Sequence, residues 1–136
     1  MRRLLTMLAL TGFAACGGDS PTEVKVSTEG SYTLRTVNGA PLPYLIPEAT
    51  TATSKYEIMD ATTTLNIGGT YTYFDHVRFT FNGKAEILSY MEAGTFTLSG
   101  TAINLRSNQG GALMSGTLGA NTLTVVAQGT SYVYTK

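Results

Sequence analysis

The sequence predicts an all-β protein in which short antiparallel strands follow one another as a sandwich or a barrel. Fifteen glycines, eight tyrosines, many threonines and no tryptophan among 136 residues favour strands and turns. From residue 30 onward, apolar and polar residues alternate, and glycine-containing turns recur roughly every 8 to 14 residues, a spacing typical of meandering strands. A chain of this length is expected to form one domain with its own core.

The N-terminus precedes this pattern and has the features of an export signal. Met1, Arg2 and Arg3 form a cationic start, and residues 4–15 are an apolar run of the length of a signal-peptide core. A membrane-spanning helix needs about 20 apolar residues, so the run is too short to be one. We therefore predict a signal peptide over residues 1–15.

The run ends in Phe13-Ala14-Ala15-Cys16, which resembles the lipobox of bacterial lipoproteins. The resemblance implies that Cys16 is lipidated on its thiol, with palmitate or a similar acyl chain, and becomes the new N-terminus. Cys16 is the only cysteine and cannot close an intramolecular disulfide. The alternative is an incidental thiol in an uncleaved N-terminal helix.

A lipidated Cys16 predicts attachment to a membrane in the cell envelope. Residues 16–29 are expected to be the lipidated cysteine followed by a flexible tether, and residues 30–136 the β-domain. Gly17 is not the aspartate that retains many lipoproteins in the inner membrane. The expected location is therefore the outer membrane, facing the periplasm or the cell surface.

The charge balance excludes two classes of partner. Nine basic residues balance nine acidic ones, and removal of Arg2 and Arg3 leaves seven against nine, a net charge of −2. Nucleic-acid binding requires a basic surface, and so does electrostatic binding to anionic lipid. Neither kind of partner is expected.

Alternation and turn signals place the strands in order along the chain. The predicted strands are residues 30–37, 54–59, 62–67, 70–81, 84–91, 94–99, 101–106, 111–118, 122–128 and 130–135. The clearest alternation lies in 70–81, where Phe74 alone breaks the pattern by standing among the polar residues. In-facing pairs at period two are Tyr32 with Leu34, Leu65 with Ile67, Phe96 with Leu98, Ile103 with Leu105, and Leu123 with Val125.

Residues 38–53 interrupt this rhythm. Three prolines within seven residues cannot lie in a central strand, so the segment must be a loop or an edge. One interpretation is an apolar lid over the mouth of a barrel, with Leu42, Tyr44, Leu45 and Ile46 turned inward. The other is a surface crossover packed on the barrel wall.

Several short motifs in this order are similar to those of the bacterial lipocalin-like lipoproteins. They are Gly30-Ser31-Tyr32-Thr33-Leu34, Val37-Asn38-Gly39, Pro41-Leu42-Pro43, Gly94-Thr95-Phe96-Thr97-Leu98-Ser99-Gly100, Gly116-Thr117-Leu118 and Tyr132-Val133-Tyr134. The resemblance covers roughly residues 30–136. It implies an all-β fold, an antiparallel up-and-down β-barrel of about 8 to 10 strands, either packed solid or holding one small apolar ligand. Tyr32 replaces the tryptophan of true lipocalins, and Lys136 stands where an arginine would cover that ring.

The sequence lacks the motifs of known catalytic and metal sites. His76 is the only histidine, and no spacing of histidines or cysteines suits zinc. Asp75 and His76 are neighbours on a strand, so their side chains point to opposite faces and cannot act as a base and its orienter. There is no G-x-S-x-G and no phosphate-binding loop. We predict neither an enzyme nor a cofactor, and no metal.

Asp75 is the most informative polar residue because the alternation places it on the inward face. A buried carboxylate requires a partner, such as a tyrosine hydroxyl, Arg35, Arg106 or a group on a ligand. The alternative is a bulge near Phe74 that turns Asp75 to solvent. Tyrosines either fill the core or bind a ligand with their hydroxyl tips. The candidate ligand-binding residues are Tyr32, Tyr44, Tyr71, Tyr73, Asp75 and Phe79.

Two functions follow from these expectations. The first is a lipid-anchored barrel that binds a small apolar or amphipathic ligand without catalysis. The second is a solid barrel that acts through its surface on a protein or an envelope polymer, as small lipoprotein inhibitors of lysozyme do. An interior cavity would distinguish the first from the second.

Overall fold

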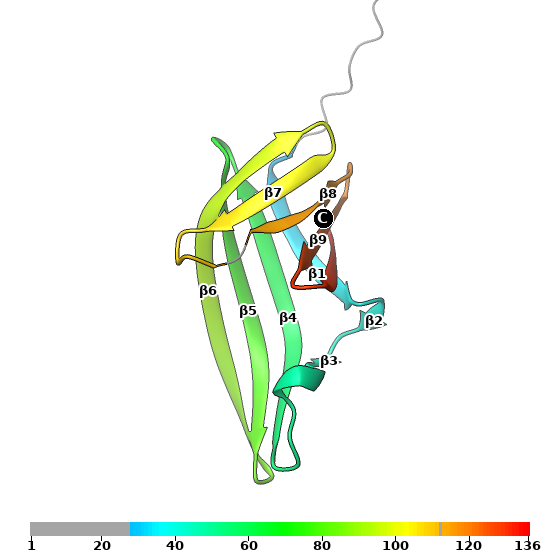
Figure 1. The fold of residues 1–136 in the computed structure, drawn as a ribbon, viewed down its shortest axis with the longest axis vertical. Coiled ribbons are helices and arrows are strands. Elements are labelled where there is room, and N and C mark those ends of the chain that lie inside the picture. The colour runs from blue at the N-terminus through cyan, green and yellow to red at the C-terminus, as the bar shows by residue number, and fades with distance from the viewer. Residues whose placement is uncertain (1–27, 112) are drawn as a thin grey trace, which may run out of the picture.

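The computed structural model describes residues 28–111 and 113–136 and is shown in Figure 1. The predicted signal peptide and Cys16 lie outside these residues. The strands are β1 (Gly30–Val37), β2 (Ala40–Pro41), β3 (Tyr44–Leu45), β4 (Ser54–Asn66), β5 (Thr70–Phe81), β6 (Lys84–Ser99), β7 (Ala102–Ser107), β8 (Met114–Leu118), β9 (Thr122–Ala127) and β10 (Thr130–Thr135). A single turn of 3-10 helix, η1, covers Pro47–Ala49. In the described part of the chain, no helix has the length and apolar character needed to cross a membrane.

The strands form a closed antiparallel barrel. From β4 to β10 each strand pairs with the next along the chain, and β1 pairs with β10 on one edge and with β4 on the other. Eight strands close the barrel in up-and-down order, while β2 and β3 add short extensions to the edges of β1 and β4. The all-β fold and the antiparallel barrel are therefore confirmed, and the sandwich is excluded.

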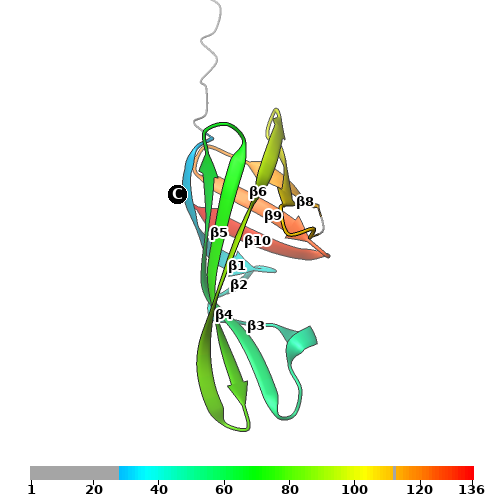
Figure 2. The same cartoon turned by 90° about the vertical axis from the view of Figure 1, so that its left-hand side faces the viewer.

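The strands are very unequal in length, and this shapes the molecule. β4, β5 and β6 have 13, 12 and 16 residues, whereas β7 to β10 have five or six each. At about 3.3 Å per residue, the long strands must project beyond the short ones. Figures 1 and 2 show β4, β5 and β6 extending past the barrel as a curled sheet that ends in the β5–β6 hairpin.

The prediction of two strands at 54–59 and 62–67 was wrong, because both belong to β4. The pairing of β4 with β5 has a β-bulge between Ile58 and Asp60, and the extra residue, Met59, has no partner on β5. The inward positions change from even numbers before the bulge, such as Ile58, to odd numbers after it, such as Ala61. In the sequence this change of parity has the same appearance as a break between two strands.

The division into 84–91 and 94–99 was also wrong, because β6 is continuous. Its first part, Lys84–Thr95, pairs with β5, and its last part, Gly94–Ser99, pairs with β7. The strand changes partners at Gly94, where a Cβ atom would overlap both the carbonyl oxygen of Arg106 and the ring of Tyr71. Glycine is needed at this corner because the neighbouring strand approaches so closely. The bounds of β1, β5 and β10 are as predicted.

One end of the barrel is packed solid. The fully buried side chains there are Tyr32, Leu65, Ile103 and Leu123. The ammonium group of Lys136 lies 5.2 Å from the centre of the Tyr32 ring, so a lysine side chain covers this ring. The first strand begins at this end, as Figure 1 shows.

Some expected core positions are exposed. Ile67 follows the end of β4 in a turn and is 81% exposed, and Leu98 near the end of β6 is also exposed. Their predicted partners, Leu65 and Phe96, do face the core. At Ile67 the alternation fails because β4 ends before its apolar pattern does.

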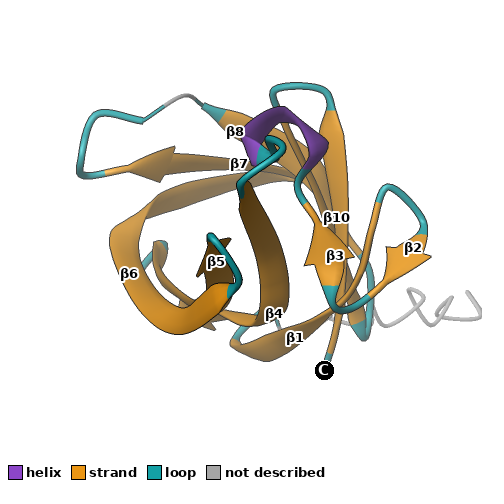
Figure 3. Cartoon of the chain, turned by 90° about the horizontal axis from the view of Figure 1, so that it is seen from below, coloured by secondary structure: helices purple, strands orange, loops and turns teal. Residues whose placement is uncertain are grey.

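The proline-containing segment 38–53 lies at the opposite, lower end of the barrel, which Figure 3 shows from below. It contributes only edge strands and the 3-10 turn, as its prolines require. Leu42, Tyr44 and Ile46 pack against the core. Leu45, which was expected to turn inward with them, is 41% exposed.

A glycine at a close approach of two strands tests the packing of the barrel. A Cβ atom at Gly116 in β8 would overlap the carbonyl oxygen of Thr124 in β9. We expect Gly116→Ala to lower the free energy of unfolding by about 2 kcal/mol or more in urea titrations. Gly119→Ala is the control, because its Cβ would lie 3.7 Å from the nearest atom, an ordinary contact. Equal stability of the two variants would contradict the observed β8–β9 packing.

Candidate ligand-binding cavity

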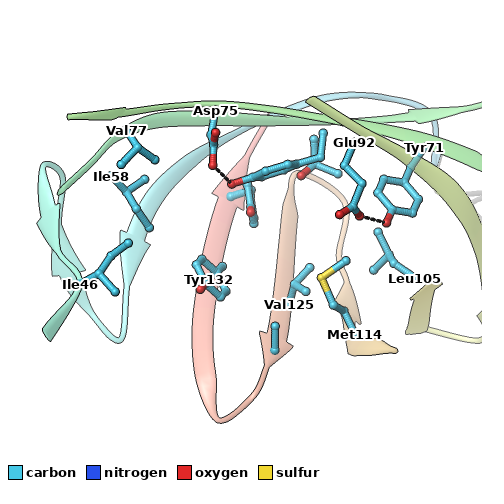
Figure 4. A pocket seen from close by; sticks show the side chains of 14 residues that line it. Ile46, Ile58, Tyr71, Asp75, Val77, Glu92, Leu105, Met114, Val125 and Tyr132 are labelled. Atoms are coloured by element: carbon cyan, nitrogen blue, oxygen red, sulfur yellow. Dashed lines mark hydrogen bonds between the residues drawn. The ribbon is translucent and has the colours of Figure 1, made fainter. Parts of the chain in front are cut away.

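The lower half of the barrel contains a cavity of about 280 Å³. Figure 4 shows the side chains that line it. They are Ile46, Ile58, Thr63, Tyr71, Tyr73, Asp75, Val77, Glu92, Leu105, Met114, Val125, Ala127, Tyr132 and Tyr134. This volume is near the lower limit of ordinary ligand sites, which begin at about 300 Å³, and is larger than the cavity of about 150 Å³ that accommodates benzene. The cavity therefore suits a small molecule of one or two rings, or one of similar size.

Asp75 lies on the inward side of β5 and is only 8% exposed. The hydroxyl of Tyr73, two residues earlier on the same face, donates a hydrogen bond of 2.7 Å to its Oδ2 atom, drawn as a dashed line in Figure 4. Burial raises the pKa of the Asp75 carboxyl, while Tyr73 and the backbone of Tyr90 act in the opposite direction. Its Oδ1 atom is buried and has no hydrogen-bond partner among the described residues.

These contacts decide between the alternatives for Asp75. A tyrosine hydroxyl is the partner, whereas Arg35 bonds to Thr135 and Arg106 is exposed. The alternative of a bulge near Phe74 is wrong, because β5 pairs without interruption with β6 and the bulge lies in β4. Phe74 stands on the outer face and is 40% exposed, so it breaks the apolar pattern without changing the register.

Glu92 is the second carboxylate of the cavity. The hydroxyl of Tyr71 donates a hydrogen bond of 2.5 Å to its Oε1 atom. In the β5–β6 ladder Glu92 lies opposite Tyr73, and Asp75 lies opposite Tyr90. The two carboxylates are therefore diagonal neighbours on one face, a relation that places Cβ atoms about 7 Å apart.

The tyrosines of the cavity remain protonated at neutral pH. Burial is the main reason that the pKa values of Tyr71, Tyr73 and Tyr134 are raised well above the usual value, and the neighbouring carboxylates add to the shift. Burial also raises the pKa of Tyr132. Their hydroxyl groups can therefore donate hydrogen bonds to the carboxylates or to a ligand.

On the outer face of the same strands, His76 pairs with Asp60 and not with Asp75. The His76 Nδ1 atom lies 2.8 Å from Asp60 Oδ1, and the ring meets Phe74 edge-on. This agrees with the expectation that neighbours on a strand face opposite ways. No group of three or more histidine, cysteine, aspartate or glutamate side chains that could hold a metal ion occurs in the part of the chain that the structure describes.

The structure brings together three of the predicted ligand-binding residues. Tyr71, Tyr73 and Asp75 line the cavity from β5. The other three, Tyr32, Tyr44 and Phe79, do not line it. Phe79 belongs to the projecting sheet, where its ring centre is 4.5 Å from that of Tyr56.

Tyr32 and Tyr44 are also separate from the cavity lining. Tyr32 is buried in the filled end of the barrel. The hydroxyl of Tyr44 lies 3.4 Å from the side-chain nitrogen of Asn38, which donates to it, and its ring packs against the core. Both residues have a structural role at the ends of the barrel.

The sequence interpretation missed most of the remaining lining residues. Glu92 was not predicted, although its even number on β6 places it on the same face as Tyr90. Val125, Tyr132 and Tyr134 had the right alternation, but alternation alone does not show which inward residues border an empty space. Ile46 lines the cavity from the proline-containing segment.

The chain was also compared with protein-family models, curated proteins and solved structures, and none of them matches it. The geometry of the cavity therefore carries the functional interpretation.

The buried carboxylate of Asp75 predicts a pH-dependent stability. Because its pKa is higher in the folded than in the unfolded protein, the folded state binds more protons between these two values, from about pH 4 upward. Stability decreases as the pH rises through this window. We expect Asp75→Asn to raise the free energy of unfolding at pH 7 by about 1 kcal/mol or more and to flatten its pH dependence, measured by urea denaturation.

Asp60→Asn is the matched control for this prediction. Its carboxylate is on the outer face, and the side chain is 57% exposed. An exposed ion pair contributes little, so the change should be about 0.5 kcal/mol or less. A loss of stability at pH 7 in Asp75→Asn, with Asp60→Asn unchanged, would show that the Asp75 carboxylate is stabilising and would contradict the prediction.

Proposed function

We propose that this protein is a lipid-anchored, lipocalin-like barrel that binds a small apolar or amphipathic molecule in its interior without catalysing a reaction. The observation that carries the proposal is the cavity of about 280 Å³ inside a barrel whose other end is filled by side chains. Its wall is mainly aliphatic and aromatic, with a few polar groups at defined positions, as in most small-molecule sites.

Two further observations support a lipocalin-like protein. The barrel has the up-and-down order that the motifs imply. The aromatic ring of the first strand is covered by a cation from the end of the last strand, through Tyr32 and Lys136. The proposed anchoring rests on the sequence around Cys16, and the proposed outer-membrane location rests on Gly17, which is not the aspartate of inner-membrane retention.

A pair of neighbouring substitutions tests binding in the cavity. Ala127 in β9 lines the cavity, and Val126 beside it faces outward and is exposed. We expect native mass spectrometry of residues 17–136, produced behind a cleavable export signal, to show an extra mass that denaturation removes. Every described strand lies within these residues. Ala127→Phe should lower the ligand-bound fraction about tenfold by filling the cavity, and Val126→Phe should leave it unchanged.

A second function is favoured by the projecting sheet. Its hairpin and the adjoining part of β6 expose the apolar side chains of Phe81, Ile87 and Leu88, and exposed apolar side chains contribute to many protein-binding sites. A bare polypeptide mass in the same experiment, for both variants and the parent, would contradict ligand binding and favour a barrel that binds a protein or an envelope polymer through this surface.

The anchor has its own test. We expect the full chain to incorporate labelled palmitate when it is expressed in a bacterium with lipoprotein processing, and to fractionate with the outer membrane. Cys16→Ser should abolish the label, because it removes the thiol that carries the acyl chain. Ser20→Cys in the Cys16→Ser background is the control for position and should not restore the label. Palmitate incorporation by the Cys16→Ser variant would contradict anchoring at Cys16.

A further inference from the structure

We propose that the cavity selects a ligand that carries a protonated amine on a small apolar body, and that Asp75 and Glu92 bind the ammonium group. This inference rests on the proposed function, because it specifies the chemistry of the molecule that the cavity binds.

The charge of the cavity supports a cationic ligand. Its described lining contains two carboxylates and no lysine, arginine or histidine. A ligand carboxylate would meet two like charges and no cation in surroundings of low dielectric constant, which is unfavourable. An ammonium group would instead neutralise charges that the fold has already placed inside the barrel. The cavity is therefore expected to bind fatty acids and other small anions poorly.

Asp75 has unused hydrogen-bonding capacity. Tyr73 engages Oδ2, while Oδ1 is buried without a partner. A buried acceptor that bonds to nothing costs about 1 to 3 kcal/mol, and the cost is higher for a charged group. Asp75 lines the cavity, and the last torsion of an aspartate side chain turns easily, so the carboxylate can adjust to a donor group on a ligand. An ammonium donor would supply the missing bond.

Glu92 supplies the second acceptor from the neighbouring strand. The hydrogen bond from Tyr71 holds one of its oxygens and fixes the direction of the side chain, as Figure 4 shows. Glu92 is a diagonal neighbour of Asp75 on the same face of the β5–β6 ladder, with Tyr73 directly opposite it. The rest of the ligand would contact the apolar wall formed by Leu105, Met114 and Val125.

A set of three probes with one naphthalene body tests this inference. They are 1-naphthylmethylamine, 1-naphthylmethanol and 1-naphthoate, which carry a cation, a neutral hydroxyl and an anion at neutral pH. We expect calorimetric titration of residues 17–136 at pH 7 to give the tightest binding for the amine, about ten- to a hundredfold tighter than the alcohol, because hydrogen bonds between charged groups are the stronger ones. The carboxylate should bind most weakly.

Substitutions locate the effect. Asp75→Asn and Glu92→Gln should each weaken amine binding about tenfold and leave alcohol binding nearly unchanged. Glu86→Gln is the matched control, because Glu86 lies on the same face of β6 but is exposed on the projecting sheet, opposite Phe79. It should alter neither affinity. Thermal unfolding of each variant shows that the barrel is intact.

The outcomes separate this inference from the proposed function. Binding of the alcohol or the carboxylate as tightly as the amine overturns the amine preference and supports the binding of apolar ligands. A preference for the amine that persists in both Asp75→Asn and Glu92→Gln overturns the role of the two carboxylates. Failure of all three probes to bind contradicts the proposed function itself.

Discussion

Closure of a single sheet on itself is the constraint on which the rest of this structure depends. A barrel removes exposed strand edges only where every strand has a neighbour on both sides. Here the first strand makes the closure, with Gly30–Thr33 paired to β4 and its later residues paired to β10. Because β7 to β10 are short, they can close only part of the length of β4, β5 and β6. The projecting sheet follows directly from this inequality of length.

The interior of the barrel has two regions. Tyr32, Leu65 and Leu123 fill the end where all eight strands run side by side. Toward the other end, side chains from β5, β9 and β10 line the cavity. The tyrosines suit this transition because a large apolar ring packs against the wall while its hydroxyl bonds to Asp75 or Glu92. The tyrosine hydroxyls thus stabilise the two carboxylates inside the barrel by donating hydrogen bonds to them. Only the Oδ1 atom of Asp75 has no hydrogen-bond partner among the buried side-chain atoms of the described residues.

Much of the fold could be predicted from the sequence, and the failures have definite physical causes. The alternation of β5 was sufficient to place Asp75 inward, since nothing interrupts its pairing with β6. The alternation of β4 was misleading, because one bulged residue, Met59, reverses the direction of every side chain that follows. The cavity lining was only partly predictable. Tyr71 and Tyr32 have the same alternation in the sequence, and only the three-dimensional arrangement of the strands shows that Tyr71 borders the cavity and Tyr32 does not.

The position at which the chain enters the barrel gives the molecule a direction. β1 begins at the filled end, and the cavity and the proline-containing segment lie toward the other end. An acyl chain on Cys16, joined to the barrel through the expected flexible tether, would therefore attach to the filled end and leave the cavity end away from the point of attachment.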